Sequence, residues 1–233
     1  IVPCDQWSDF SQYKMLVIPP LYIATDALQE KIDRFVKDGG HVVMFFKSAF
    51  CNENSIVRPV LAPGPLRKAC GFYYQEYANV GTMSLKDNPF HLKEQGAIGE
   101  WYEFLIPETA KPLAYADDPF FGNWPVITEN NYGKGKLTYI GTYPSLELLE
   151  TIVRNVAKEA GVTIPKSDLQ FPVIVRSGKN DFGKNIRYVF NYGRDDKKIT
   201  YPFPAGKSLL SGANIKQNEE ITLKPWDVVI VEE

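Results

Sequence analysis

Residues 13–66 read YKMLVIPPLYIATDALQEKIDRFVKDGGHVVMFFKSAFCNENSIVRPVLAPGPL, and this stretch decides the fold class. Residues 15–18 are a short apolar run, residues 26–38 have helical periodicity, and residues 41–46 are apolar and rich in β-formers. A strand, a helix and a second strand in this order predict a parallel-sheet crossover. We therefore expect residues 15–18 and 41–46 to be neighbouring central strands of a three-layer, mostly parallel α/β sheet.

Capping residues mark the ends of two predicted helices. Asp26 is the expected N-cap of the first helix, with Gln29 three residues on, and Gly39 suits the left-handed position after its end. A second amphipathic helix is expected from Ser145 to Gly161. Further strands are predicted at 101–106, 126–128 and 137–141, with a turn around residues 133–135 joining the last two.

The pattern changes after Pro165, where short β-runs alternate with glycine-containing turns. The runs are residues 173–176, 186–191, 198–202 and 228–231. They predict a small antiparallel β-domain over residues 166–233, with the boundary near Lys166 and a first domain over residues 1–165. A chain of 233 residues is long enough for two such domains.

The loop after residue 46 has a particular residue order. The ordered positions are Gly39 and Gly40, Glu53 and Asn54, Pro63, Gly64, Pro65, Leu66 and Arg67, and then Gly71 and Phe72. This order resembles the middle, trimer-forming domain of family 42 glycoside hydrolases, the β-galactosidases. The resemblance continues through residues 124–145, with a Tyr-Gly-Lys-Gly hairpin followed by Tyr-Ile-Gly-Thr-Tyr-Pro-Ser. The tail, residues 186–231, is similar to the small C-terminal β-domain of that family.

The resemblance implies a flavodoxin-like or amidotransferase-like trimerisation domain, truncated before its first strand and helix, and then a β-sandwich-like domain. It further implies a non-catalytic fragment of an enzyme that hydrolyses terminal β-galactosides, with roles in self-association and in support of the catalytic barrel. Such a barrel needs about 250 residues and carries two carboxyl groups about 5 Å apart. The resemblance places both glutamates upstream of Ile1, so we assign no catalytic residue and expect this chain to be inactive alone.

Two alternative functions remain open from the residues. Cys51 follows a predicted strand, as the nucleophile of a class I glutamine amidotransferase does, but it lacks flanking glycines and an adjacent helix, and the only histidines are His41 and His91. A carbohydrate-binding module would instead need exposed coplanar aromatic rings. We expect most aromatic side chains to fill a core.

The candidate site residues are structural or interface residues. The turn 117–124, DDPFFGNW, holds too many aromatic side chains to be buried within one subunit, and the loop 48–66 is expected to be ordered yet poor in regular structure. Arg67 should be held by a carboxylate or by backbone carbonyls. The full set is Glu53, Asn54, Pro63, Gly64, Pro65, Arg67, Phe120, Phe121 and Trp124.

Composition excludes several classes of partner. The net charge is -2 with scattered basic residues, so nucleic acid is not expected. No apolar run reaches the roughly 20 residues that cross a bilayer, so no membrane partner is expected. The three cysteines include no Cys-x-x-Cys pair, which argues against a metal site. Their odd number leaves at least one free thiol, which favours a reducing, cytoplasmic location, with an exported parent left open. The glycines at 133 and 135 belong to a hairpin, so we expect no cofactor.

Overall fold

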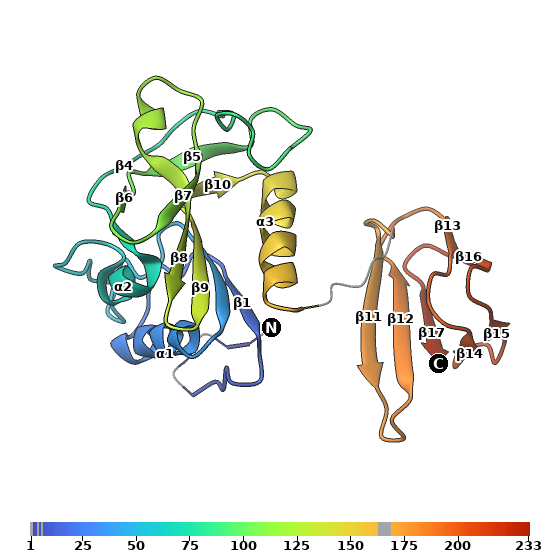
Figure 1. Cartoon of the computed structure of the whole chain (residues 1–233). Helices are drawn as coiled ribbons and strands as arrows, with labels where there is room; N and C mark the ends of the chain where they lie inside the picture. Colours follow the sequence, from blue (N-terminus) through green and yellow to red (C-terminus); the bar gives the residue numbers. More distant parts are fainter. Residues whose placement is uncertain (1, 4, 6, 163–168) are drawn as a thin grey trace. The chain divides into compact units, whose positions relative to one another are not determined.

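The computed structural model describes residues 2–3, 5, 7–162 and 169–233 (Figure 1). The chain divides into two compact units, Ile1–Ile164 and Pro165–Glu233. The boundary expected near Lys166 and the first cysteine, Cys4, lie outside the described residues. Each unit has its own hydrophobic core.

The main sheet of the first unit has five strands in the order β1-β2-β9-β8-β7. They are β1 (Met15–Ile18), β2 (His41–Phe45), β9 (Gly135–Ile140), β8 (Pro125–Tyr132) and β7 (Lys111–Tyr115). Strands β1 and β2 pair in parallel, with Met15 opposite His41, so the predicted crossover is confirmed. Strand β9 also runs parallel to β2.

Two features of this sheet differ from the prediction. The pairs β8–β9 and β7–β8 are antiparallel, so the sheet is mixed and the expectation of a mostly parallel sheet is wrong. The reason is local, because Gly133 with φ 61° allows a tight hairpin turn before β9 that an antiparallel pair needs and a parallel pair cannot use. In addition, β1 is an edge strand of the sheet and not a central one.

Helices cover both faces of this sheet, as predicted. Helix α1 (Asp26–Lys37) and the short α2 (Arg67–Cys70) lie on one face, and α3 (Leu146–Glu159) lies on the other (Figure 1). Alternate residues of β2 divide between the two cores: Val42 and Met44 pack with α1, and Val43 and Phe45 pack with α3. The first unit therefore has three layers.

Helix α1 begins one residue earlier in the chain than the sequence indicates. Thr25, not Asp26, is the N-cap, and its Oγ1 accepts a hydrogen bond from the Leu28 amide at 3.1 Å. The Asp26 carboxylate is thereby left available to a distant partner, Arg58. Helix α3 has the predicted cap, since Ser145 Oγ accepts from the Leu148 amide at 3.3 Å.

Shorter strands extend the first unit beyond the main sheet. Strand β5 (Ile98–Glu103) pairs with β10 (Thr142–Pro144) and with β4 (Tyr77–Ala78), and β3 (Phe72–Tyr73) pairs with β6 (Ile106–Pro107). The strand predicted at 101–106 is thus divided between β5 and β6, each in a different sheet. Two 3-10 turns, η1 (Gly64–Leu66) and η2 (Phe121–Asn123), fall within the predicted loop and the predicted aromatic turn.

The second unit is an antiparallel β-domain, as predicted. Its larger sheet has the order β11-β12-β17-β14-β15, and a separate pair joins β13 to β16. The strands are β11 (Val173–Lys179), β12 (Asn185–Asn191), β13 (Lys197–Thr200), β14 (Gly206–Ser208), β15 (Asn214–Ile215), β16 (Glu220–Leu223) and β17 (Val228–Glu232). Within the described ranges, no helix is long and apolar enough to cross a membrane.

Candidate functional site

The chain leaves β2 through a tight turn, residues 46–49, that a buried carboxylate holds. Lys47 and Ala49 both have positive φ, at 58° and 59°, a conformation that side chains other than glycine seldom adopt. The Lys47 amide donates to Glu103 Oε1 at 2.7 Å. Ser48 closes the turn, since its Oγ donates to the Phe45 carbonyl at 2.6 Å. The turn is therefore held by a hydrogen bond within residues 45–48 and by one from Glu103 of strand β5.

Glu103, the last residue of β5, is completely buried. Its Oε1 also accepts from Trp101 Nε1 at 3.2 Å, and its Oε2 accepts from the Tyr139 hydroxyl at 2.8 Å. None of the ion pairs formed by the described residues includes Glu103, and the Lys47 ammonium lies instead 3.8 Å from the centre of the Trp101 ring. Burial without a cation raises the pKa of Glu103 to about 7, although its amide and hydroxyl donors act in the opposite direction.

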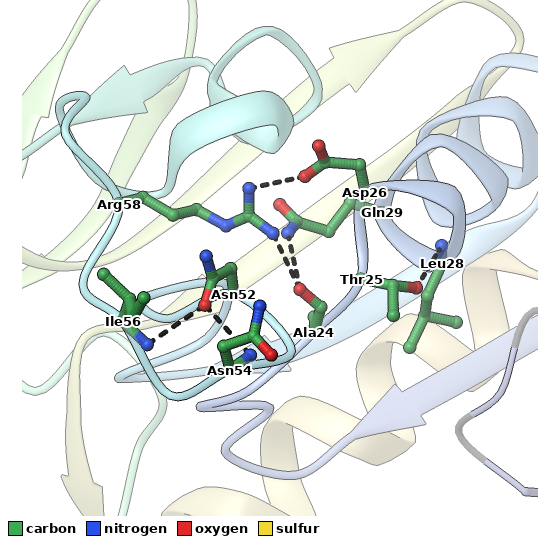
Figure 2. Close-up of polar contacts among 9 residues, drawn as sticks. All are labelled: Ala24, Thr25, Asp26, Leu28, Gln29, Asn52, Asn54, Ile56 and Arg58. Atoms are coloured by element: carbon green, nitrogen blue, oxygen red, sulfur yellow. Dashed lines mark hydrogen bonds and ion pairs between the residues drawn. The ribbon is translucent and has the colours of Figure 1, made fainter.

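The next segment, residues 50–58, is held by Arg58, whose side chain is only 11% exposed. Figure 2 shows its guanidinium at the start of α1, where Nη1 donates to Asp26 Oδ1 at 2.5 Å and Nη2 donates to the Ala24 carbonyl at 2.7 Å. With the Gln29 amide turned so that its oxygen faces the guanidinium, this oxygen accepts from Nη2 at 2.8 Å and from Nε at 3.2 Å. The fork of Arg58 thus fastens the loop to α1 at three acceptors.

Glu53 and Asn54 lie at the exposed tip of this segment. The turn is organised by their neighbour Asn52, whose Oδ1 accepts from the amides of Asn54 and Ile56, both at 3.0 Å (Figure 2). Glu53 is exposed, and its carboxylate forms no side-chain hydrogen bond or ion pair within the part of the chain that the structure describes.

Pro63, Gly64, Pro65 and Arg67 form the base of the loop, as a buried proline, the turn η1 and the start of α2. The Arg67 guanidinium donates to both oxygens of Glu108, at 2.8 and 2.5 Å, so of the two predicted kinds of partner the carboxylate is the one found. The ion pair is half-exposed, and it lowers the pKa of Glu108 and raises that of Arg67. Apart from isolated bridges and η1, the loop 48–66 is irregular, as predicted.

Phe120, Phe121 and Trp124 belong to a different surface. Phe121 and Trp124 pack with the core on the α3 face, and Phe120 meets the edge of the Phe104 ring. The Trp124 ring stacks on Phe104 at 4.5 Å, and Phe121 lies 6.0 Å from the same ring. The Tyr102 hydroxyl lies 2.9 Å from the Phe121 carbonyl and 2.7 Å from that of Trp124. Phe120 remains 55% exposed. The structure therefore does not bring this turn together with the loop 48–66, whose core residues Ala49 and Leu66 face α1.

The geometry around Cys51 does not form a nucleophilic site. Cys51 is buried, and its amide donates to the Tyr22 carbonyl at 2.8 Å. His41 begins β2, whereas Cys51 follows the far end of that strand. The residues with positive φ in the turn after β2 are Lys47 and Ala49, not Cys51. In the parts of the chain that the structure describes, no group of three or more His, Cys, Asp or Glu side chains could hold a metal ion.

The aromatic side chains near this site do not form a sugar platform either. Tyr77 stacks on Trp101 at 4.2 Å, and the Lys47 ammonium occupies a position over the same ring. A sugar ring would need a free aromatic face, and both contacts compete for it. The polar contacts of this site hold the segments that follow β2 in shape.

Two residues of this site, Arg58 and Glu103, were not singled out from the sequence. Each nevertheless carries a signal, since a lone charged residue stands in an apolar context: Arg58 in Ile-Val-Arg-Pro-Val and Glu103 in Trp-Tyr-Glu-Phe-Leu. A buried charge needs partners, but neither motif indicates which residues those partners are.

Comparison with known proteins gives one consistent result. Residues 1–163 match the family described as the β-galactosidase trimerisation domain. The chain is 28% identical over 223 residues to β-galactosidase LacA of Lactobacillus acidophilus, covering 96% of this chain and 32% of that protein. It is 30% identical over 229 residues to β-galactosidase LacZ of Heyndrickxia coagulans, covering 95% of this chain and 32% of that protein. The chain thus spans about a third of the length of these curated relatives.

Solved structures agree. The β-galactosidase from Bacillus circulans sp. alkalophilus superposes with a TM-score of 0.84 at 26% identity, over 98% of this chain and 34% of that one. The cold-adapted β-galactosidase from Rahnella sp. R3 has the same fold, with a TM-score of 0.80 at 22% identity over 98% of this chain and 34% of that one. Neither comparison favours an amidotransferase or a carbohydrate-binding module.

Proposed function

The chain belongs to the trimerisation-domain family of the family 42 β-galactosidases, and from this premise we propose that it serves self-association and supports the catalytic barrel of such an enzyme. The observation that carries the proposal is the family match over residues 1–163, joined to an alignment with β-galactosidases over at least 95% of the chain. The proposed assembly is a trimer. The proposed substrate of the whole enzyme is a terminal β-galactoside, which places the protein in carbohydrate metabolism.

We assign the parts of the chain accordingly. Residues 1–165 are the proposed trimerisation domain, of flavodoxin-like or amidotransferase-like type, and residues 166–233 are the proposed β-sandwich-like C-terminal domain. The proposed interface residues are Glu53 and Asn54 of the loop 48–66, Arg67 at the start of α2, and Phe120 of the aromatic turn. We propose a cytoplasmic location, with an exported parent left open, and the free, buried thiols of Cys51 and Cys70 support it.

The proposal assigns hydrolysis to the catalytic barrel and a structural role to this chain. Hydrolysis with retention needs two carboxyl groups about 5 Å apart facing a sugar-sized cleft. Glu103 is the one completely buried carboxylate described above, and it is enclosed by Trp101, Tyr139 and the turn at Lys47. It therefore has no path to a substrate, and we assign it a structural role.

The proposal is tested with the chain itself. Light scattering over a dilution series should give a mass that rises with concentration, as a weak oligomer requires, because one domain contributes only part of a trimer interface. The same sample should not hydrolyse a chromogenic β-galactoside above background. Hydrolysis in a sample free of host enzyme would contradict the proposal.

A chimera completes the test. The chain replaces the corresponding third of the Lactobacillus acidophilus β-galactosidase, and the chimera should regain both a defined trimer and hydrolysis of the β-galactoside. A control in which an unrelated α/β domain of similar size replaces that third should lose both. An active, trimeric control would show that the barrel needs no support from this chain.

A further inference from the structure

We propose that the peptide between Phe46 and Lys47 is a proton-operated switch. The ionised carboxylate of Glu103 holds this peptide with its N–H group turned towards β5, and a proton taken up by Glu103 releases it. The switch belongs to the first unit alone and needs neither self-association nor a galactoside.

The held peptide is a strained one. Lys47 has φ 58°, in the left-handed region, and its amide donates to Glu103 Oε1 at 2.7 Å. The φ angle of a residue changes when the peptide before it turns, so a rotation of the 46–47 peptide would take Lys47 out of this region. The hydrogen bond to Glu103 therefore opposes a relaxation of the backbone.

The neighbours of this peptide are fixed independently of Glu103. The Phe46 amide donates to the Ile140 carbonyl at 2.7 Å, and the Ala49 amide donates to the Leu21 carbonyl at 2.8 Å. Ser48 Oγ accepts from the Leu21 amide at 3.1 Å. None of these bonds contains a group that titrates, so a change of charge on Glu103 acts on one peptide and leaves the rest of the turn in place.

Glu103 is the group of this cluster that changes charge near neutral pH. Burial raises its pKa to about 7, whereas the pKa values of the Cys70 thiol and of the Tyr74 and Tyr139 hydroxyls are raised so far that these groups stay neutral. The titratable or charged groups around it come from several segments: Asp33 of α1, Lys47 of the turn, Cys70 of α2, Tyr74 after β3, Tyr77 of β4 and Tyr139 of β9.

The site can accommodate both forms of the carboxyl group. Oε1 accepts from the Lys47 amide and from Trp101 Nε1, whereas Oε2 accepts from the Tyr139 hydroxyl, so Oε2 is the oxygen with room for the proton. The Tyr74 hydroxyl is buried, acts on the pKa of Glu103 and makes no well-formed hydrogen bond within the described residues. Hydroxyl groups can accept as well as donate, so an acceptor for the new O–H group is at hand.

Protonation weakens the bond that holds the peptide. With the proton on Oε2, Oε1 becomes a neutral acceptor, and the Lys47 amide loses a charge-assisted hydrogen bond. The Lys47 ammonium, 3.8 Å from the centre of the Trp101 ring, belongs to the same residue and moves with it. The ionised form thus holds the turn most tightly, although it is the form that is costly to bury.

The switch has a signature that separates it from a change in overall stability. The grip on the Lys47 amide should increase as the pH rises through the pKa of Glu103. The free energy of unfolding of the whole chain should not increase with it, because a raised carboxyl pKa makes that free energy fall up to about pH 7 and then level off. Local and global stability therefore respond to pH in opposite directions.

Amide hydrogen exchange of the whole chain, followed by NMR, tests the switch. After correction for the intrinsic pH dependence of exchange, the protection of the Lys47 amide should rise about tenfold between about pH 6 and pH 8.5, since a hydrogen bond to a charged acceptor is the stronger one. In Glu103→Gln, whose side chain is neutral at every pH, the protection should stay at the value for low pH. The amides of the central strand β2 should gain no protection over the same range.

The Lys93 amide is the matched control within the same sample. It also donates to a carboxylate, that of Glu147, at 2.9 and 3.1 Å. Glu147 is partly exposed, and this bond lowers its pKa, so it remains ionised over the whole range. The protection of Lys93 should therefore be constant, and the contrast with Lys47 isolates the effect of burying the carboxylate.

Tyr139→Phe keeps the prediction testable if Glu103→Gln does not fold. The variant retains the ring and removes the donor to Oε2, so the ionised form loses a partner and the rise in Lys47 protection should move to higher pH. Protection of Lys47 that is constant with pH, or that falls as the free energy of unfolding falls, would overturn the switch. A rise that persists in Glu103→Gln would do the same. Neither association nor hydrolysis enters these measurements, so the proposed function stands or falls separately.

Discussion

Two consecutive segments after β2 are held by charged side chains of opposite sign, and the two side chains differ in the partners that surround them. The turn 46–49 is held by Glu103, whose oxygens accept only from neutral N–H and O–H groups. The loop 50–58 is held by Arg58, which donates to a carboxylate as well as to a carbonyl and an amide oxygen.

The difference decides how each segment responds to pH. A carboxylate surrounded by dipoles keeps its negative charge at a desolvation cost, and the pKa of Glu103 is therefore raised to about 7. A guanidinium has no accessible neutral form and stays charged. We thus expect the turn to be sensitive to pH near neutrality and the loop to be insensitive there.

The largest predicted effect is a pH dependence of stability that arises from Glu103. Its pKa is about 7 in the folded protein against an ordinary value of 4.5, so the folded chain binds this proton more tightly than the unfolded chain. The free energy of unfolding should therefore fall as pH rises from about 4.5 to about 7 and then level off, by up to about 3 kcal/mol. Glu103→Gln should remove this slope in urea unfolding measured at several pH values.

Glu108→Gln is the matched control for that slope. Arg67 holds the pKa of Glu108 below its ordinary value. At pH values above that ordinary value the ionised carboxylate therefore stabilises the fold, and this contribution is lost as the pH falls through the lowered pKa. The two variants should thus change the pH profile in opposite directions. If the free energy of unfolding of Glu103→Gln varied with pH as that of the natural chain does between about pH 4.5 and 7, Glu103 would not be the source of the pH dependence.

The next effect concerns the loop anchor. Arg58→Ala leaves the carbonyl of Ala24 and the amide of Gln29, both buried residues, without their main partner. We expect a loss of about 2 kcal/mol in the free energy of unfolding that does not vary between pH 5 and 7. Arg58→Lys keeps the positive charge but not the planar guanidinium. Its free energy of unfolding should lie between those of the natural chain and of Arg58→Ala. A loss that grows with pH would mean that the anchor is coupled to Glu103.

The smallest effect is expected at the exposed ion pair. Arg67→Ala removes the contacts with Glu108 and with the Tyr73 ring, but both charges are half-exposed and screened by water. The fall in melting temperature should be smaller than for Arg58→Ala. An unchanged melting temperature together with an unchanged oligomer size would remove any special role from Arg67.

Local patterns explain which elements could be predicted. The cap at Ser145, the crossover from β1 to β2 and the hairpin glycine at 133 each depend on residues close in sequence, and all three are confirmed. The cap at Thr25 was missed because Thr25 and Asp26 are both good capping residues, and the choice depended on Arg58, which binds Asp26 from 32 positions away.

The sequence by itself thus determined the family, the three-layer order of the first unit and the antiparallel second unit. Only the tertiary structure decided that the main sheet is mixed, that Glu103 holds a turn 56 positions away, and that Arg58 fastens the loop 50–58 to the start of α1. The physical reason is that periodicity and capping act within a few residues, whereas the partners of a buried charge are chosen by packing between segments that are distant in the chain.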